Sequence, residues 1–273
     1  VDEMLESGVA RESEGAVCVF FDGDAKLDDK PAIVRKADGG FLYATTDLAT
    51  IDFRVQQWHA DQIWYVVGAP QQLHFQQIFE ATRKRGQNPS MHHIAFGSIL
   101  GEDRKLMKTR SGDNVQLVDV LDEAVERADR VIGEKNPDMD PTERAEVASI
   151  VGIGSVKFAE LSQHRMTDYV FSWDRMLALQ GDTAPYLQYS YVRVRSIFRK
   201  LDGQMNIDPS ALSIEADAEV HLARMLVRFG ETVPILLDDF RPNLLANYLL
   251  ELAKAFHSFF EACPVLKSEG ETQ

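Results

Sequence analysis

A parallel sheet is predicted by residues 63–96, IWYVVGAPQQLHFQQIFEATRKRGQNPSMHHIAF. The segment opens with the apolar run Ile63–Val67, which is typical of a strand buried on both faces, and it closes with a similar run, His93–Phe96. Residues Leu73–Arg85, which lie between the two runs, have the period of a helix. Because a strand, a crossover helix and a second strand make a parallel pair, this part of the chain is assigned to the α/β class.

The residues before this segment predict mixed structure. Val17–Phe21 has the composition of a strand, and a polar turn follows it. Ala32–Arg35 and Phe41–Tyr43 flank a pair of glycines and predict a hairpin. A Thr-Asp pair then supplies an N-cap for a helix over about 46–59.

The character of the chain changes after about Pro137, where strand signals nearly vanish. A helix is predicted to open at Pro141, and Met205–Ser213 reads as a linker that contains proline. We therefore predict two domains, an α/β part over 1–140 and a helical part over 141–273. The predicted helical segments are Val147–Gln163, Ala184–Leu201, Ala216–Phe229 and Asn243–Cys263.

Composition excludes several classes of protein. The chain has 45% hydrophobic and 26% charged residues, which is ordinary for a globular protein, and its two cysteines cannot form a disulfide framework. No apolar run approaches the length of a membrane span. The net charge of −14 argues against nucleic-acid binding over the whole surface, although it does not exclude a local basic patch. The chain opens with Val1 rather than methionine, which we interpret as a piece of a longer protein.

A pocket for a planar cation is suggested where the predicted hairpin meets the following helix. Asp47 at this edge is suited to pair with a guanidinium through both carboxylate oxygens, and Tyr43 is suited to flank it. Gln71 and His74 open the next helix at the same edge of the sheet. The alternative remains open that Asp47 is an ordinary helix cap and that the other three are packed or surface groups.

The segment Gly101–Gly112 holds four basic residues and is suited to bind phosphates. Lys105 and Lys108 lie three residues apart, with hydroxyl side chains close by. The segment lacks the glycine and lysine spacing of a Walker loop, and a solvated run of charges is the alternative. The pair Gly152-Ile-Gly154 lies in a helical pattern and is not a dinucleotide fingerprint.

The predicted helix that begins at Ala184 is locally basic in an acidic chain. Gln188, Arg195 and Arg199 fall on one face of it, and tyrosines accompany them. Arginines with neighbouring aromatic rings suit RNA, although the tyrosines of a helical bundle can equally belong to its core.

Together, these motifs resemble those of a known family. Lys105-Leu-Met-Lys108-Thr109 resembles the Lys-Met-Ser-Lys-Ser loop of class I aminoacyl-tRNA synthetases, from which Leu106 and Met107 depart. The other motifs, in their order along the chain, resemble those of the arginyl-tRNA synthetases, and this resemblance covers nearly the whole chain. These motifs are Tyr43–Ala49, Gly68-x-x-Gln71-x-x-His74-Phe75, His93-x-x-Phe96-Gly97, Lys108-Thr-Arg-Ser-Gly112, Gly181-Asp-Thr-Ala-Pro-Tyr-Leu-Gln-Tyr189 and Tyr248-Leu-Leu-Glu-Leu-Ala253 with Phe259-Phe-Glu-Ala-Cys263.

The resemblance implies a fold and a set of site residues. The fold is the second half of a Rossmann-like parallel-sheet catalytic domain, followed by a helical-bundle anticodon-binding domain. No metal-binding residue is implied. The implied residues are Tyr43, Asp47 and Gln71 for arginine, Lys105 and Lys108 for catalysis and ATP, Ser98, Ile99 and His74 for ATP, and Gln188, Tyr189 and Arg193 for tRNA.

The resemblance also implies an activity, which is the ATP-dependent conversion of arginine to arginyl-adenylate and its transfer to the 3′ end of tRNA(Arg). ATP is then a substrate that comes with Mg²⁺, no cofactor is tightly bound, and the full-length enzyme is expected to be a cytoplasmic monomer.

One departure is serious, because no His-Ile-Gly-His signature is present. We therefore expect the isolated chain to be a C-terminal fragment that is inactive alone. Two alternatives stay open, a catalytically dead RNA-binding module and a class I synthetase for another amino acid. Asp47, which suits a cationic side chain, argues against the second.

Overall fold

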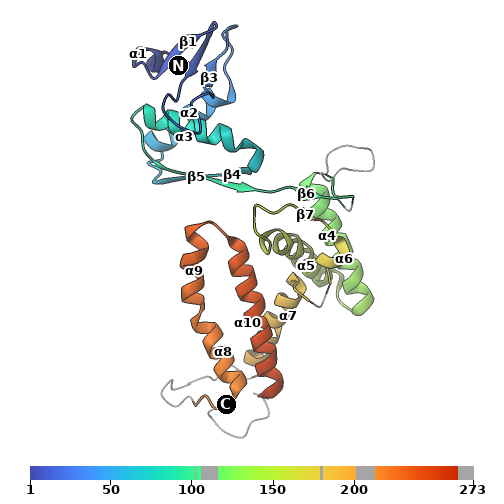
Figure 1. Ribbon diagram of the computed structural model, residues 1–273. Coiled ribbons are helices and arrows are strands. Elements are labelled where there is room, and N and C mark those ends of the chain that lie inside the picture. The colour runs from blue at the N-terminus through green and yellow to red at the C-terminus, as the bar shows by residue number, and fades with distance from the viewer. Residues whose placement is uncertain (102, 106–115, 179–180, 201–212, 264–273) are drawn as a thin grey trace. The chain divides into compact units, whose positions relative to one another are not determined.

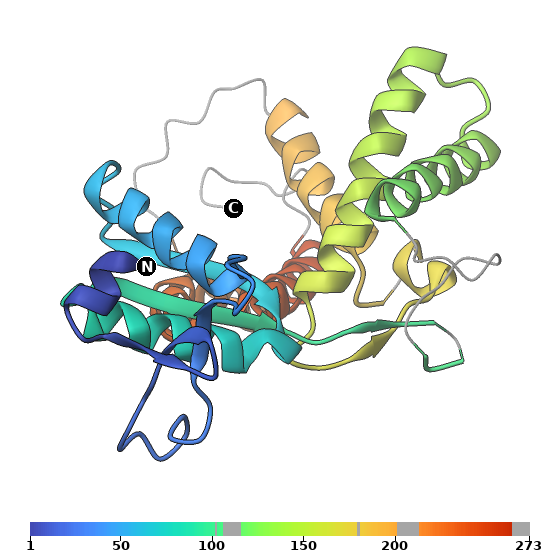
Figure 2. The same ribbon diagram turned by 90° about the horizontal axis from the view of Figure 1, so that it is seen from above.

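The computed structural model describes residues 1–101, 103–105, 116–178, 181–200 and 213–263 (Figure 1). Two compact units make up the chain, Val1–Gly97 and Ser98–Gln273. The first unit mixes strands and helices, and the second is dominated by helices (Figures 1 and 2). The predicted order, α/β followed by all-α, is confirmed.

The first unit contains a parallel pair of strands. Strand β4 (Gln62–Gly68) pairs with β5 (Ser90–Phe96), with Gln62 opposite Ser90 and Gly68 opposite Phe96. The 3₁₀ turn η1 (Ala69–Gln71) and helix α3 (Gln72–Lys84) connect them. The strand–helix–strand unit predicted from residues 63–96 is therefore confirmed.

The burial of β4 differs from the prediction. Ile63 and Tyr65 are buried, but Trp64 is 52% exposed and Val66 is 63% exposed. The buried face packs on α3, where the ring centroid of Tyr65 lies 4.7 Å from that of Phe75. The expectation of a strand buried on both faces was wrong, because an apolar run alone does not show whether a second layer of structure covers it.

A small antiparallel sheet precedes this pair. Helix α1 (Asp2–Glu6) leads into strands β1 (Ala10–Ser13), β2 (Ala16–Val19) and β3 (Ala32–Arg35), which lie in that order. Strand β2 thus confirms the predicted strand but begins and ends earlier. The predicted hairpin is reduced to one isolated bridge between Arg35 and Phe41, because the chain enters a helix two residues later.

Helix α2 (Tyr43–Gln56) starts before the predicted Thr-Asp cap. Leu42 is the N-cap residue and makes no side-chain cap. Thr46 donates its hydroxyl to the Tyr43 carbonyl oxygen at 2.9 Å, so it bonds inside the helix instead of capping it. Thr45 donates to the carbonyl oxygen of Val34 and thereby ties this end of the helix to β3.

Among the described residues, the second unit contains the helices predicted for the C-terminal half and three that were not predicted. The unpredicted helices are α4 (Leu117–Lys135), α6 (Trp173–Met176) and α9 (Phe229–Asp238). A short parallel pair of strands also occurs, β6 (Ile99–Leu100) with β7 (Tyr169–Val170). The predicted helices are α5 (Pro141–Leu161), α7 (Ala184–Lys200), α8 (Asp217–Val227) and α10 (Pro242–Ala262).

Helices α4 and α5 pack closely against each other. Helix α5 opens as predicted at Pro141, where the Asp140 side chain accepts hydrogen bonds from the backbone N–H groups of Thr142 and Glu143. A Cβ atom at Gly152 would lie 2.7 Å from the backbone carbonyl of Ala124 on α4. Gly152 therefore allows two helices to approach, in keeping with its rejection as part of a dinucleotide fingerprint.

Most of the predicted linker, and all of the basic segment beyond Lys105, lie outside the described residues. The proposed domain boundary between residues 140 and 141 falls within the second compact unit and stays a prediction.

Candidate active site and RNA-binding surface

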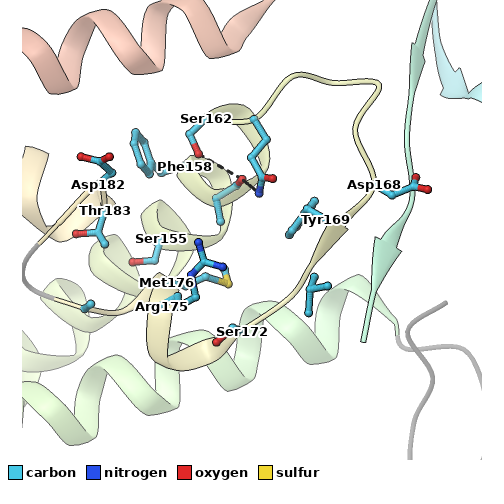
Figure 3. Close-up of a pocket in the computed structure, with 14 residues that line it drawn as sticks. Ser155, Phe158, Ser162, Asp168, Tyr169, Ser172, Arg175, Met176, Asp182 and Thr183 are labelled. Carbon is cyan, nitrogen blue, oxygen red and sulfur yellow. Dashed lines mark hydrogen bonds between the residues drawn. The ribbon is translucent and has the colours of Figure 1, made fainter. Parts of the chain in front are cut away.

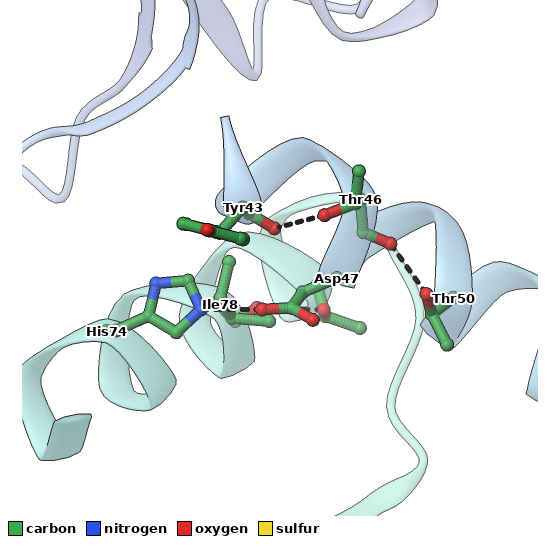
Figure 4. A network of polar contacts seen from close by, with 7 residues as sticks. Tyr43, Thr46, Asp47, Thr50, His74 and Ile78 are labelled. Atoms are coloured by element: carbon green, nitrogen blue, oxygen red, sulfur yellow. Dashed lines mark hydrogen bonds and ion pairs between the residues drawn. The ribbon is translucent and has the colours of Figure 1, made fainter. Parts of the chain in front are cut away.

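Asp47 and His74 come together between two helices of the first unit (Figure 4). Asp47 lies near the start of α2, and His74 lies in the first turn of α3. The Nε2 atom of His74 is 2.6 Å from Oδ2 of Asp47. The side chain of His74 is 26% exposed and that of Asp47 is 32% exposed, so the carboxylate of Asp47 is partly shielded but still accessible to a ligand.

Tyr43 and Gln71 lie near this pair in the sequence, and both are exposed. Tyr43 is the first residue of α2, one turn before Asp47, and 84% of its surface is accessible (Figure 4). Gln71 ends η1, directly before α3. In the described part of the chain, no hydrogen bond joins either side chain to Asp47. The structure thus pairs Asp47 with His74, although the sequence assigned these residues to different substrates.

This arrangement is suited to bind a cation. The contact with His74 engages only Oδ2 of Asp47, so the carboxylate retains Oδ1 for a further donor. An aromatic ring lies on the same helix one turn earlier, where it can contact the face of a planar cation. A guanidinium has the matching fork of N–H donors.

Ser98 and Ile99 lie at the start of the second unit, next to β7. The backbone N–H of Ser98 donates to Oδ1 of Asp168 at 2.6 Å, and Ile99 is opposite Tyr169 in the parallel pair. The backbone of these two residues is therefore held by the strand that follows α5.

Lys105 lies in a tight turn with its side chain exposed. The N–H of Gly101 donates to the carbonyl oxygen of Lys105 at 2.8 Å, and the N–H of Lys105 donates to Asp103 Oδ1 at 3.0 Å. Lys108 lies outside the described residues. The structure therefore places one of the two predicted phosphate-binding lysines.

The three residues predicted to bind tRNA lie close together on α7. Gln188 donates from Nε2 to the carbonyl oxygen of Ile150 on α5 at 3.0 Å. Tyr189 is 53% exposed, and its hydroxyl accepts a hydrogen bond from Arg193 at 2.7 Å. Arg193 also contacts His257 of α10. His257 is a residue that the sequence analysis missed, since no motif surrounds it and only the packing of α7 on α10 makes it relevant.

A polar cavity of about 610 Å³ lies between α5, β7 and α6 (Figure 3). Ser155, Tyr169, Arg175 and Thr183 are among the residues that line it. The Tyr169 hydroxyl donates to the Glu160 carboxylate, and burial together with this contact raises the pKa of Tyr169 above its usual range. Tyr169 is therefore a neutral hydroxyl at physiological pH. Sequence reasoning missed this cavity because its walls come from several elements that share no motif.

Two family models match consecutive parts of the chain. Residues 1–173 match the family described as "tRNA synthetases class I (R), catalytic domain". Residues 187–273 match the "DALR anticodon binding domain". The two matches together define the chain as one of the class I tRNA synthetases.

Individual relatives indicate the family within this class to which the chain belongs. The chain is 49% identical over 278 residues to a protein of Thermobifida fusca named "Arginine--tRNA ligase", and 48% identical over 279 residues to one of the same name from Laribacter hongkongensis. These alignments cover 99% and 100% of the chain but only 48% of each relative, so the chain spans about half the length of these relatives. The chain belongs to the arginine-type family of class I tRNA synthetases.

Solved structures show the same fold. The arginyl-tRNA synthetase of Plasmodium falciparum aligns with a TM-score of 0.78 and 27% identity, over 97% of this chain and 45% of that one. The Thermus thermophilus enzyme aligns with a TM-score of 0.80 and 23% identity, over 99% of this chain and 50% of that one. The predicted fold, the second half of a class I catalytic domain followed by an anticodon-binding domain, is confirmed.

No helix among the described residues is both long enough and apolar enough to cross a lipid bilayer.

Proposed function

We propose that this chain carries part of the machinery of an arginine–tRNA ligase, which activates arginine with ATP and transfers it to the 3′ end of tRNA(Arg). The observation that carries the proposal is the 49% identity over 99% of the chain to a protein of that name, with both family matches in the same order. The geometry of Asp47 supports the choice of arginine, because a partly shielded carboxylate is the natural partner of a guanidinium.

In this proposal the first unit binds the amino acid. Asp47 accepts two N–H groups of the guanidinium, a charge-assisted contact that contributes about 1.5–3 kcal/mol per hydrogen bond. Tyr43 covers the planar cation with its exposed ring, and Gln71 approaches from the start of α3. His74 holds Oδ2 of Asp47 and lies at the edge where ATP would be bound.

Lys105 and Lys108 bind the phosphates of ATP while the arginine carboxylate attacks the α-phosphorus. A bond forms from a carboxylate oxygen to that phosphorus, and the bond to the β-phosphate oxygen breaks, which releases pyrophosphate. The two ammonium groups stabilise charge on the phosphoryl oxygens. Ser98 and Ile99 lie against the adenine in this proposal.

ATP is expected to bring Mg²⁺ with it. Among the described residues, no group of three or more His, Cys, Asp or Glu side chains converges on a metal position. We propose that the ion is held by the phosphates as part of the substrate. We further propose that the full-length enzyme is a monomer of the cytoplasm.

The second unit binds tRNA(Arg) in this proposal, and Gln188, Tyr189 and Arg193 on α7 are the tRNA-binding residues. Exposed Arg195 and Arg199 give the same helix a basic surface that attracts phosphates. The helix thus binds RNA locally, although the chain as a whole carries a net charge of −14.

Aminoacylation by the full-length protein tests the proposal. We expect tRNA(Arg) to be charged with arginine and not with lysine, and we expect arginine-dependent ATP–pyrophosphate exchange. Charging with a different amino acid would favour another class I synthetase, and tRNA binding without exchange would favour a dead RNA-binding module. The isolated 273-residue chain is expected to show no exchange, since it spans 48% of the relatives it matches.

A further inference from the structure

Arg193 is already engaged by aromatic side chains of its own unit. Its Nη2 atom donates to the hydroxyl of Tyr189, one turn earlier on α7, at 2.7 Å. Its Cζ atom lies 4.7 Å from the ring centroid of Tyr189 and 4.7 Å from that of Phe260 on α10. Two rings thus flank the guanidinium, an arrangement that favours cation–π contact.

His257 completes the surroundings of Arg193. The Nη1 atom of Arg193 donates to Nδ1 of His257 at 3.0 Å, which requires that Nδ1 carries no proton. A neutral His257 then has its hydrogen on Nε2 and donates it to Ser190 Oγ at 2.9 Å. Ser190 donates in turn to the carbonyl oxygen of Tyr186 at 2.9 Å. Every donor in this chain of hydrogen bonds meets an acceptor, which defines one orientation for each side chain.

Tyr189 is held by this cluster and still accessible. Its ring lies nearly parallel to that of His257, with an angle of 18° and 6.0 Å between centroids. At the same time, 53% of its surface remains exposed. An aromatic ring that is fixed in place but open to solvent is suited to stack on an unpaired base.

We propose that Arg193 and His257 are positioning residues, which hold the ring of Tyr189 as a stacking platform for an unpaired RNA base, and that Arg193 makes no contact of its own with a phosphate. This inference rests on the proposed function, because the RNA is the tRNA(Arg) of that reaction. The phosphate contacts fall instead to exposed cations of α7 such as Arg195.

The dependence of affinity on salt separates the two roles of Arg193. A side chain that contacts a phosphate releases a counterion, so its removal lowers the slope of log affinity against log salt by about 0.7–0.9. Loss of a positioning residue weakens binding and leaves this slope unchanged, because no phosphate contact is lost.

The experiment measures binding of a tRNA(Arg) transcript to the full-length protein across a series of salt concentrations. We expect Arg193→Met and Arg193→Lys each to weaken binding about tenfold, the scale of one lost base–aromatic stack, without a change in slope. Tyr189→Leu should weaken binding to a similar extent. Arg195→Met, which removes an exposed cation from the same helix, is the matched control for a lost charge.

Variants of His257 test the second half of the proposal. His257→Asn keeps an acceptor close to the position of Nδ1 and should bind within about threefold of wild type, whereas His257→Leu should lose as much affinity as Arg193→Met. The double variant with Arg193→Met and His257→Leu should be no weaker than either single variant, because both remove the same support. Thermal unfolding of each variant confirms that it is folded.

Two results would overturn the inference. If Arg193→Lys binds like wild type while Arg193→Met lowers the slope, Arg193 is a phosphate contact. If neither His257 variant changes affinity, the cluster does not position Tyr189. A wild-type protein that fails to bind tRNA(Arg) would instead refute the proposed function, and this inference with it.

Discussion

At the scale of single residues, the carboxylate of Asp47 has His74 as its polar side-chain contact among the described residues and a guanidinium as a second partner in the proposed complex. His74 contacts Oδ2, and an arginine guanidinium would need both oxygens. An oxygen of a carboxylate has two lone pairs, so Oδ2 can contact His74 and accept a further hydrogen bond from the guanidinium.

We expect Asp47→Ala in the full-length protein to weaken arginine binding by about 10–100-fold, because one charge-assisted bidentate contact is lost. ATP binding should change little. Calorimetric titration with each substrate measures both. Asp52→Ala is the matched control, since Asp52 lies on the same helix but binds Arg85 at 2.7 Å and Gln87 at 2.8 Å. Equal arginine affinity in the Asp47 variant and wild type would contradict the assignment.

Titration of His257 should make stability depend on pH. Burial and the charge of Arg193 on α7 lower the pKa of His257 from its ordinary value of 6.5, while Glu261 on α10 acts in the opposite direction. The unfolded chain therefore binds a proton at a pH where the folded chain does not, so stability falls as the pH drops below about 6.5. This loss is complete once the pH is below the lowered pKa of the folded state.

Thermal unfolding over a pH series checks this expectation. On acidification from about pH 7 to about pH 5, the melting temperature of wild type should fall further than that of His257→Asn. His221→Asn is the control, because His221 is exposed on α8. Identical pH profiles for wild type and His257→Asn would refute the expectation.

At the scale of elements, the sequence does not show which glycines are required where two helices pack together. The packing of α4 on α5 depends on the absence of a side chain at Gly152. Helix α9, by contrast, has Gly230 at a position where a Cβ atom would meet nothing within 4 Å. The two glycines make a matched pair for a substitution experiment.

We expect Gly152→Ala to destabilise the protein by about 1–3 kcal/mol, because its Cβ would meet the Ala124 backbone at 2.7 Å and force the helices apart. Gly230→Ala should be neutral or stabilise by up to about 1 kcal/mol, since alanine favours an open helical position. Denaturant unfolding of both variants measures the difference. A Gly152 variant as stable as wild type would show that α4 and α5 can separate at little cost.

Most elements that have a clear hydrophobic pattern, or a residue that marks where a helix begins, could be predicted from sequence. Helix α5 was predicted at its first residue by Pro141, and β4 and β5 by their apolar runs. Helix α4 is an exception, since it was missed although apolar residues such as Leu121, Ala124, Val125 and Ala128 recur in it at helical spacing.

Other features depend on tertiary structure and have no local signal. Helix α9 was missed because Gly230 and Pro234 are poor helix formers, and its neighbours α8 and α10 support it instead. Strands β6 and β7 have two residues each, which is too short for any periodicity. Among the candidate site residues, Asp47 was proposed from its chemistry and from the resemblance, whereas its contact with His74 required the packing of α2 on α3.

At the scale of the whole molecule, one face of β4 carries exposed apolar side chains. Trp64 and Val66 are 52% and 63% exposed on β4, although parallel sheets are ordinarily covered on both faces. The relatives are about twice as long as this chain, so they have further residues that could cover such a face.

We expect the isolated 273-residue chain to associate in solution and to bind an apolar dye through this face. Val66→Lys should reduce both effects, because a charge disfavours contact between apolar surfaces. Sedimentation velocity and dye fluorescence measure them. Val227→Lys is the control, since Val227 is 75% exposed on α8, an element of the other unit. A monomeric wild-type chain without bound dye would contradict this expectation.

The close approach at Gly152 has a consequence for how related sequences diverge. A position where any side chain would meet backbone atoms cannot drift under neutral mutation, whereas Gly230 is free to vary. Across the family, position 152 should therefore remain glycine as the surrounding residues change. Because a second glycine lies close by, an invariant glycine at this position resembles part of a nucleotide-binding signature. Its cause is instead the short distance between two helices.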